Sequence, residues 1–160
     1  MNDILNFINN NKSVTFIGMP GTGKTYTTDY ISNKYNIPKI ELDENIEKKY
    51  NNTLSKIINI YGEKEFKNIE YNAILDINFD KPKLISTGGS VIYSDEGMKY
   101  LKNDKNIIIY LKTDFDILKE RTENFTNRGI IFNGYTPKEL YNNRSVLYEK
   151  YADYIYSKVI

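Results

Sequence analysis

The sequence predicts a three-layer α/β fold in which helices cover both faces of a five-stranded parallel β-sheet. Short runs with strand propensity alternate with longer helical patterns along the 160 residues. A glycine-rich loop follows the first run and opens a helix, which is the order of a parallel strand–helix unit. Residues 106–111 (NIIIYL) form an apolar run typical of a strand buried on both faces. No linker or internal repeat divides the chain, so we expect one domain over residues 1–160.

Five runs have the composition of strands. Each is rich in β-branched, aromatic or other large apolar residues and is bounded by glycine, proline or polar residues. Gly18 ends the first run, Pro38 precedes the second, and a Gly-Gly pair halts the third. In chain order we expect strands at residues 13–17, 39–42, 83–87, 106–111 and 154–160.

Helices are expected where apolar residues recur three or four positions apart. This spacing runs from Ile46 to Ile58 and predicts one helix over residues 43–59, which Gly62 separates from the next. Residues 123–136 are polar, contain glycine and lack such a period, so they predict a loop. In chain order we expect helices at residues 3–9, 25–35, 43–59, 63–76, 115–121 and 137–151.

The loop after the first strand fits the phosphate-binding signature G-x-x-x-x-G-K-[ST] at every specified position. Its glycines let the backbone wrap phosphates, N–H groups at the helix N-terminus point at the anion, and Lys24 adds a positive charge. Thr25 would place its hydroxyl on Mg²⁺. A glycine-rich turn with an incidental Lys-Thr pair is the competing interpretation. The signature predicts nucleotide binding by Gly18, Gly21, Thr22, Gly23, Lys24 and Thr25.

Composition narrows the chemistry by elimination. The chain contains no cysteine and no histidine, so a thiol nucleophile and a disulfide are excluded and a general base must be a carboxylate, lysine or tyrosine. Mg²⁺ with oxygen ligands is the natural metal. A net charge of +1 offers no case for nucleic-acid or membrane partners. Neither a signal peptide nor a membrane span is visible and cysteine is absent, so we expect a cytoplasmic protein, and we also expect a monomer.

Three arginines stand out against the composition. The 22 basic residues include only Arg121, Arg128 and Arg144, and all three follow the phosphate loop. Where usage favours lysine so strongly, a retained arginine is a candidate for a position that needs the planar, permanently charged guanidinium. Drift explains the three positions equally well, and composition alone leaves both interpretations open.

Four stretches downstream of the loop resemble the shikimate kinase family. They read ELDENIE at residues 41–47, GEKEFKNIE at 62–70, ISTGGS at 85–90 and RSVLY at 144–148, the last followed by Ala-Asp. Their order and spacing are similar to that family over most of the chain. The resemblance implies a P-loop NTPase fold of the nucleoside-monophosphate-kinase-like group. It also implies a substrate-binding helical region near residues 43–76 and a lid near residues 123–136.

The resemblance implies ATP-dependent phosphorylation of shikimate to shikimate 3-phosphate, a step in aromatic amino-acid biosynthesis, with Mg²⁺ as the metal. Lys24 and the loop amides would hold the β- and γ-phosphates, and Arg121 would lie against the adenine. Arg128 matches a lid arginine that reaches the transferring phosphate. Thr25 and Glu41 would stand at the metal.

For the acceptor, the resemblance implies that Asp43 orients or deprotonates the attacking hydroxyl. Gly88 and Gly89 match a turn whose backbone approaches the substrate, and Arg144 matches an arginine that pairs with its carboxylate. Phosphoryl transfer depends mainly on positioning and charge stabilisation, and it needs an acid beside the acceptor hydroxyl. Asp43 is also a suitable N-cap for the helix that follows it, and the two roles are compatible.

Three residues depart from the family pattern. Lys67 stands where the family has a second carboxylate-binding arginine, Glu41 where it has aspartate, and Ser90 where it has a third glycine. Lys67 keeps the charge but loses the bidentate guanidinium, which leaves open another small hydroxy acid as the acceptor. A nucleotide-binding module with impaired catalysis is the other alternative, because the family's adenine-contacting loop would follow Ile160.

Overall fold

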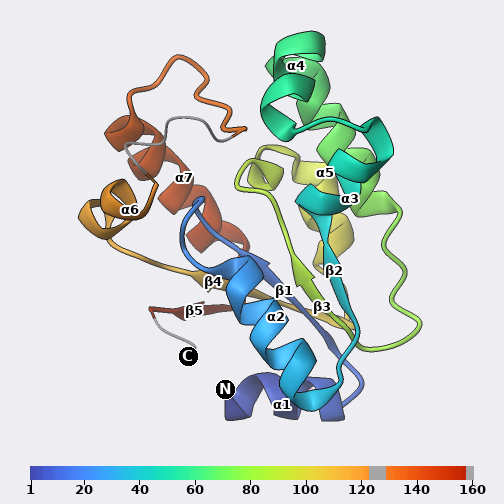
Figure 1. The fold of residues 1–160 in the computed structure, drawn as a ribbon. Coiled ribbons are helices and arrows are strands. Elements are labelled where there is room, and N and C mark those ends of the chain that lie inside the picture. Colours follow the sequence, from blue (N-terminus) through green and yellow to red (C-terminus); the bar gives the residue numbers. More distant parts are fainter. Residues whose placement is uncertain (123–128, 158–160) are drawn as a thin grey trace.

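Five parallel strands form one sheet in the order β2-β3-β1-β4-β5 (Figure 1). The computed structural model describes residues 1–122 and 129–157. The central strand pairs with β3 on one side and β4 on the other, so the chain order reverses around it. In open α/β folds, ligands bind beyond the carboxyl ends of the strands at such a reversal. The strands are β1 (Ser13–Ile17), β2 (Lys39–Glu41), β3 (Leu84–Ser86), β4 (Asn106–Leu111) and β5 (Tyr154–Tyr156).

Helices cover both faces of the sheet, which confirms the expected layering (Figure 1). On one face, Phe16 and Ile109 pack with residues of the first two helices. On the other face, Ile108 and Tyr110 pack with helices from the C-terminal half of the chain. The helices are α1 (Asn2–Asn9), α2 (Lys24–Tyr35), α3 (Leu42–Tyr50), α4 (Leu54–Leu75), η1 (Val91–Tyr93), α5 (Asp95–Leu101), α6 (Phe115–Arg121) and α7 (Pro137–Tyr151).

α3 and α4 stand together beyond the sheet and share a separate apolar cluster (Figure 1). The predicted single helix over residues 43–59 is wrong, because the backbone turns left-handed at Asn51 (φ 50°) and ends α3. Thr53 then caps α4 through its side chain. Asn51 ends one helix and Thr53 begins the next, but the apolar spacing continues across both positions and does not reveal the break. Gly62 (φ 82°) kinks α4 where the sequence predicts an interruption.

The segment between β3 and β4 holds η1 and α5, where the apolar spacing predicts no helix. Ser94 begins α5 by accepting a hydrogen bond from the Gly97 N–H at 3.0 Å. No helix in the described part of the chain is both long enough and apolar enough to cross a membrane.

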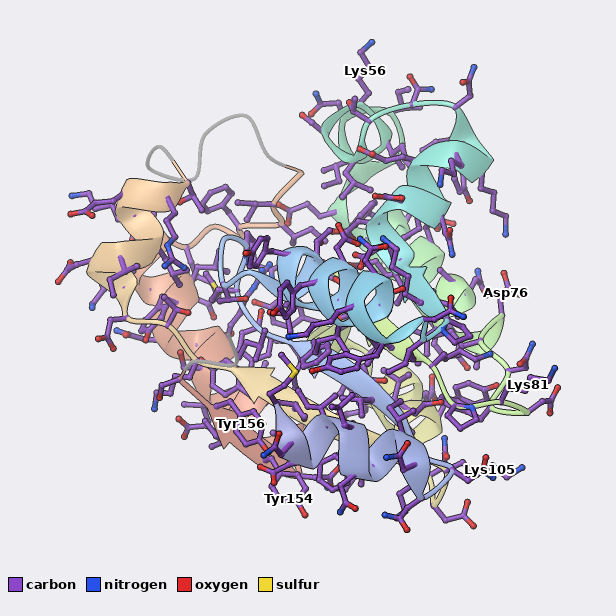
Figure 2. The ribbon with its side chains drawn as sticks, turned by 60° about the horizontal axis from the view of Figure 1, so that its bottom comes forward. Lys56, Asp76, Lys81, Lys105, Tyr154 and Tyr156 are labelled. Atoms are coloured by element: carbon purple, nitrogen blue, oxygen red, sulfur yellow. The ribbon has the colours of Figure 1, made fainter. Side chains whose placement is uncertain are left out.

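β5 is shorter than the predicted strand over residues 154–160, of which 158–160 lie outside the described residues. Its two tyrosines lie beside α1 (Figure 2). The Tyr154 ring packs on Phe7 with centroids 5.2 Å apart, and the Tyr156 hydroxyl donates to Asp3 Oδ2 at 3.0 Å. These side chains therefore hold the N-terminal helix against the last strand.

Candidate active site

A cavity of about 640 Å³ lies beyond the carboxyl ends of the strands. The segments that line it follow β1, β2 and β3 and come also from α4 and α6. The structure thus brings together eight of the residues that the sequence predicts: Gly21, Gly23, Lys24, Thr25, Asp43, Gly88, Gly89 and Arg121. Five others are not among the residues that line it: Gly18, Thr22, Glu41, Lys67 and Arg144. Arg128 lies outside the described residues.

The phosphate loop joins β1 to α2 as its signature predicts. Gly18 has φ +148°, and a Cβ there would lie 2.8 Å from the Leu111 carbonyl oxygen, so only glycine fits. Gly23 (φ 88°) begins α2 in the left-handed region. Lys24 Nζ donates to the carbonyl oxygens of Gly18 at 2.8 Å and Met19 at 3.0 Å, which holds the ammonium group across the loop.

The two predicted metal ligands lie at neighbouring positions. Thr25 Oγ1 is 3.4 Å from Ser86 Oγ, and Ser86 is aligned with Glu41 across β2 and β3. Glu41 is buried and accepts a hydrogen bond from Thr28 through Oε1. A hydroxyl and a carboxylate are the oxygen donors that Mg²⁺ prefers beside phosphates and water. The described residues contain no group of three or more acidic, histidine or cysteine side chains able to hold a metal alone.

Asp43 lines the cavity, and one of its carboxyl oxygens is buried. The residue lies in the first turn of α3, whose N-cap is Glu41, so its interpretation as an N-cap is wrong. Oδ1 is inaccessible to solvent and has no hydrogen-bond partner among the described residues. Burial raises the pKa of this carboxyl to about 6, while the Lys24 charge opposes the shift and Glu41 and Glu47 add to it. A buried carboxylate without a donor is unfavourable unless a ligand supplies one.

Glu70 is a second buried acid at the cavity, and our sequence reasoning missed it. Its Oε2 accepts from Ser90 Oγ at 2.5 Å. A Cβ placed on Gly88 would lie 2.6 Å from Glu70 Oε1 and 2.7 Å from Asp43 Oδ1, so both oxygens converge beside this glycine. One signal could have revealed Glu70: it is a charged residue four positions after Phe66 on the buried stripe of α4.

Burial also changes the acidity of Glu70. Desolvation raises the pKa of its carboxyl to about 8. The Ser90 hydrogen bond opposes this shift, the Asp43 charge adds to it, and the charges of Arg144 and Lys67 oppose it. The cavity therefore holds two carboxyl groups that differ in acidity.

The two predicted carboxylate-binding cations differ in placement. Arg144 on α7 is 1% exposed, and its Nη2 donates to the Ile131 carbonyl oxygen at 2.7 Å. A Cβ on Gly89 would lie 2.8 Å from Arg144 Nη1, so the guanidinium stands directly behind the cavity wall. Lys67 Nζ instead donates to Asn133 Oδ1 at 2.9 Å and lies 5.0 Å from the centre of the Tyr93 ring.

The described end of the predicted lid, residues 129–136, packs on the helical region. Ile131 is fully buried in the apolar cluster of α3 and α4. The Phe132 N–H donates to Glu63 Oε1 at 3.1 Å, and a Cβ on Gly129 would lie 2.4 Å from Leu54 Cβ. Residues 123–128 of the predicted lid lie outside the described residues. At the other end of that segment, Arg121 Nη1 donates to the Gly21 carbonyl oxygen at 3.4 Å.

Solved structures of other proteins share this fold. Its structure is similar to a shikimate kinase from Acinetobacter baumannii in complex with shikimate, with a TM-score of 0.82 and 24% identity over 93% of this chain and 84% of that one. A shikimate kinase from Aquifex aeolicus gives a TM-score of 0.77 at 24% identity, over 92% and 88% of the two chains. At this identity the likeness confirms the fold, the nucleoside-monophosphate-kinase-like P-loop architecture.

Sequence comparison gives the family. The sequence model described as shikimate kinase matches residues 20–159. The shikimate kinase of Dictyoglomus turgidum is 39% identical over 150 residues, which covers 89% of this chain and 86% of that protein. That of Thermodesulfovibrio yellowstonii is 37% identical over 147 residues, 89% of this chain and 83% of that protein. With a phosphate loop, a facing carboxylate and this similarity over nearly its whole length, the chain belongs to the shikimate kinase family.

Proposed function

We propose that this protein is an ATP-dependent kinase that converts shikimate to shikimate 3-phosphate for aromatic amino-acid biosynthesis. The observation that carries the proposal is Asp43, which lines the cavity shared with the phosphate loop and has a buried carboxyl oxygen, Oδ1, without a partner among the described residues. An acceptor hydroxyl is the donor that this oxygen lacks. Family membership makes shikimate the first candidate for that acceptor.

The nucleotide would lie along the phosphate loop. Lys24, already held across the loop, would contact the β- and γ-phosphates, and the loop N–H groups would bind their oxygens. Thr25 and Glu41 would hold Mg²⁺, which supplies neutralisation of the phosphate charge when bound. Arg121 would lie against the adenine and Arg128, outside the described residues, would reach the transferring phosphate.

The acceptor would lie between the two acids and Arg144. Asp43, with a pKa of about 6, is mainly ionised at neutral pH and can accept the hydroxyl proton as the phosphoryl group transfers. Glu70 Oε1 would contact a neighbouring hydroxyl. Arg144 would pair with the carboxylate through Nη1, the guanidinium nitrogen beside Gly89, because Nη2 is engaged by the Ile131 carbonyl.

The proposal includes one kinase domain over residues 1–160, with the acceptor-binding region at 43–76 and the lid at 123–136. It also includes a cytoplasmic monomer without nucleic-acid or membrane partners. The near-neutral net charge of +1 supports the absence of a polyanionic partner. Sedimentation at micromolar concentration tests the monomer.

A kinase for another small hydroxy acid is the second candidate, and Lys67 is the observation that favours it. Its ammonium group donates to Asn133, whereas Arg144 Nη1 lies beside Gly89 in the cavity wall, so the carboxylate site has one cation where the family pattern has two arginines. An acceptor with a weaker need for a second cation would suit this arrangement.

Coupled measurement of ADP release against shikimate, quinate and gluconate separates these candidates. We expect shikimate to give the highest kcat/KM, with a KM raised by the loss of one bidentate contact. Turnover of another acid with none of shikimate would contradict the assignment and leave the kinase proposal intact. No acceptor-dependent ADP release at all, with ATP binding retained, would indicate a nucleotide-binding module with impaired catalysis.

A further inference from the structure

Glu70 has a buried carboxyl group that depends on a single side chain for its orientation. Among the described residues, Ser90 supplies its one hydrogen bond, at 2.5 Å, and none of the ion pairs involves it. The two nearby cations are engaged elsewhere, Lys67 by Asn133 and Arg144 by the Ile131 carbonyl. Ser90 itself is 6% exposed and lines the same cavity.

The contact determines where the other carboxyl oxygen of Glu70 points. The terminal torsion of a glutamate is broad, so the carboxyl group rotates readily unless one oxygen is held. Ser90 holds Oε2, and Oε1 then lies beside Gly88 on the same side as Asp43 Oδ1. Two carboxyl groups that converge in this way suit a substrate with neighbouring hydroxyl groups.

We propose that Ser90 is a positioning residue for the acceptor, which fixes the Glu70 carboxyl group so that Glu70 and Asp43 together contact neighbouring hydroxyls of the substrate. The inference rests on the proposed function, because it takes this cavity as the acceptor site. The family pattern has glycine at this position, which cannot make the contact. Ser90 therefore supplies in this chain an orienting contact that a glycine lacks.

The kinetic test uses Ser90→Ala, which removes the hydroxyl, and Ser90→Thr, which keeps it. We expect Ser90→Ala to raise the KM for shikimate by up to about tenfold, since the loss of one ordinary hydrogen bond corresponds to at most about that factor in affinity. The KM for ATP and kcat should stay within about twofold, as expected when acceptor binding alone is weakened. Ser90→Thr should restore the KM.

Ser94→Ala is the matched control. It also removes a serine hydroxyl that makes a hydrogen bond, in this case from the Gly97 N–H at 3.0 Å, but Ser94 does not line the cavity. It should lower the melting temperature and leave the KM for shikimate unchanged. An unchanged KM in Ser90→Ala, or an equal rise in Ser94→Ala, would overturn the proposal.

A second measurement separates this inference from the proposed function. In protein with ¹³C-labelled glutamate carboxyls, loss of the Ser90 donor should raise the pKa of Glu70, because that hydrogen bond lowers it. The charges that face Glu70 from Asp43, Lys67 and Arg144 are the same in both proteins. If wild-type protein releases no ADP with shikimate, the proposed function fails, and this titration alone decides whether Ser90 holds Glu70. An identical Glu70 titration in Ser90→Ala would refute the contact.

Discussion

Gly88→Ala tests the arrangement of the two acids with one methyl group. The added Cβ would lie 2.6 Å from Glu70 Oε1 and 2.7 Å from Asp43 Oδ1, whereas ordinary contact begins at 3.4 Å. Both carboxyl groups must therefore retreat by about 0.7–0.8 Å, and a displacement near 1 Å can cost about 10²-fold in rate. We expect kcat/KM for shikimate to fall by roughly 10²-fold, or about 2.7 kcal/mol of transition-state stabilisation.

The assay is coupled ADP release at varied shikimate and saturating ATP, with calorimetric binding of ATP measured in parallel. Gly62→Ala is the control, because Gly62 has φ +82° and no atom within 4 Å of an added Cβ. That substitution introduces backbone strain of about 1–2 kcal/mol without moving either acid. A Gly88→Ala protein that keeps kcat/KM within threefold of wild type would refute the placement of the two carboxyls at the acceptor.

Three further results are expected. Lys24→Met should lower kcat by about 10³-fold or more, because charge stabilisation dominates this chemistry, while circular dichroism shows an intact fold. Near-normal turnover would exclude the loop lysine from the mechanism. The Glu70 carboxyl has a pKa of about 8 in the folded protein, against a usual value of 4.5. Between about pH 5 and 8 the folded protein therefore keeps a proton that the unfolded chain has lost, so the free energy of unfolding should fall as pH rises through this range. Urea unfolding of Glu70→Gln should show a weaker decline, and an equal slope would contradict the raised pKa. Arg144→Ala should weaken shikimate binding by about 2–3 kcal/mol while Lys67→Arg lowers the KM, and calorimetry that ranks them oppositely would refute the carboxylate assignment.

Local patterns were enough to predict the elements that surround the phosphate loop. Strand β1 and helix α6 have the predicted bounds, and β1 ends where Gly18 follows it in the sequence. The apolar strand β4 is likewise where its composition predicts it. The predicted helix over residues 43–59 was wrong because apolar spacing continues across the break, whereas the left-handed turn at Asn51 depends on backbone conformation.

The acceptor side of the cavity depends on contacts that no local pattern contains. Glu70 and Ser90 are 20 positions apart, and only the packing of α4 against the turn after β3 brings them together. The engagement of Lys67 by Asn133, 66 positions away, likewise requires the tertiary fold. The sequence therefore predicted which cations and which first acid to consider, while the contact between the second acid and Ser90 became visible only in three dimensions.

In the proposed reaction, Asp43 accepts the proton of the acceptor hydroxyl during phosphoryl transfer. The most direct test is kcat of Asp43→Asn at saturating ATP and shikimate, since asparagine keeps the shape of the side chain and removes its basic oxygen. We predict a loss of about 10²–10⁴-fold in kcat with the Kd for ATP unchanged within a few-fold. A variant that retains kcat within a few-fold of wild type would contradict the claim.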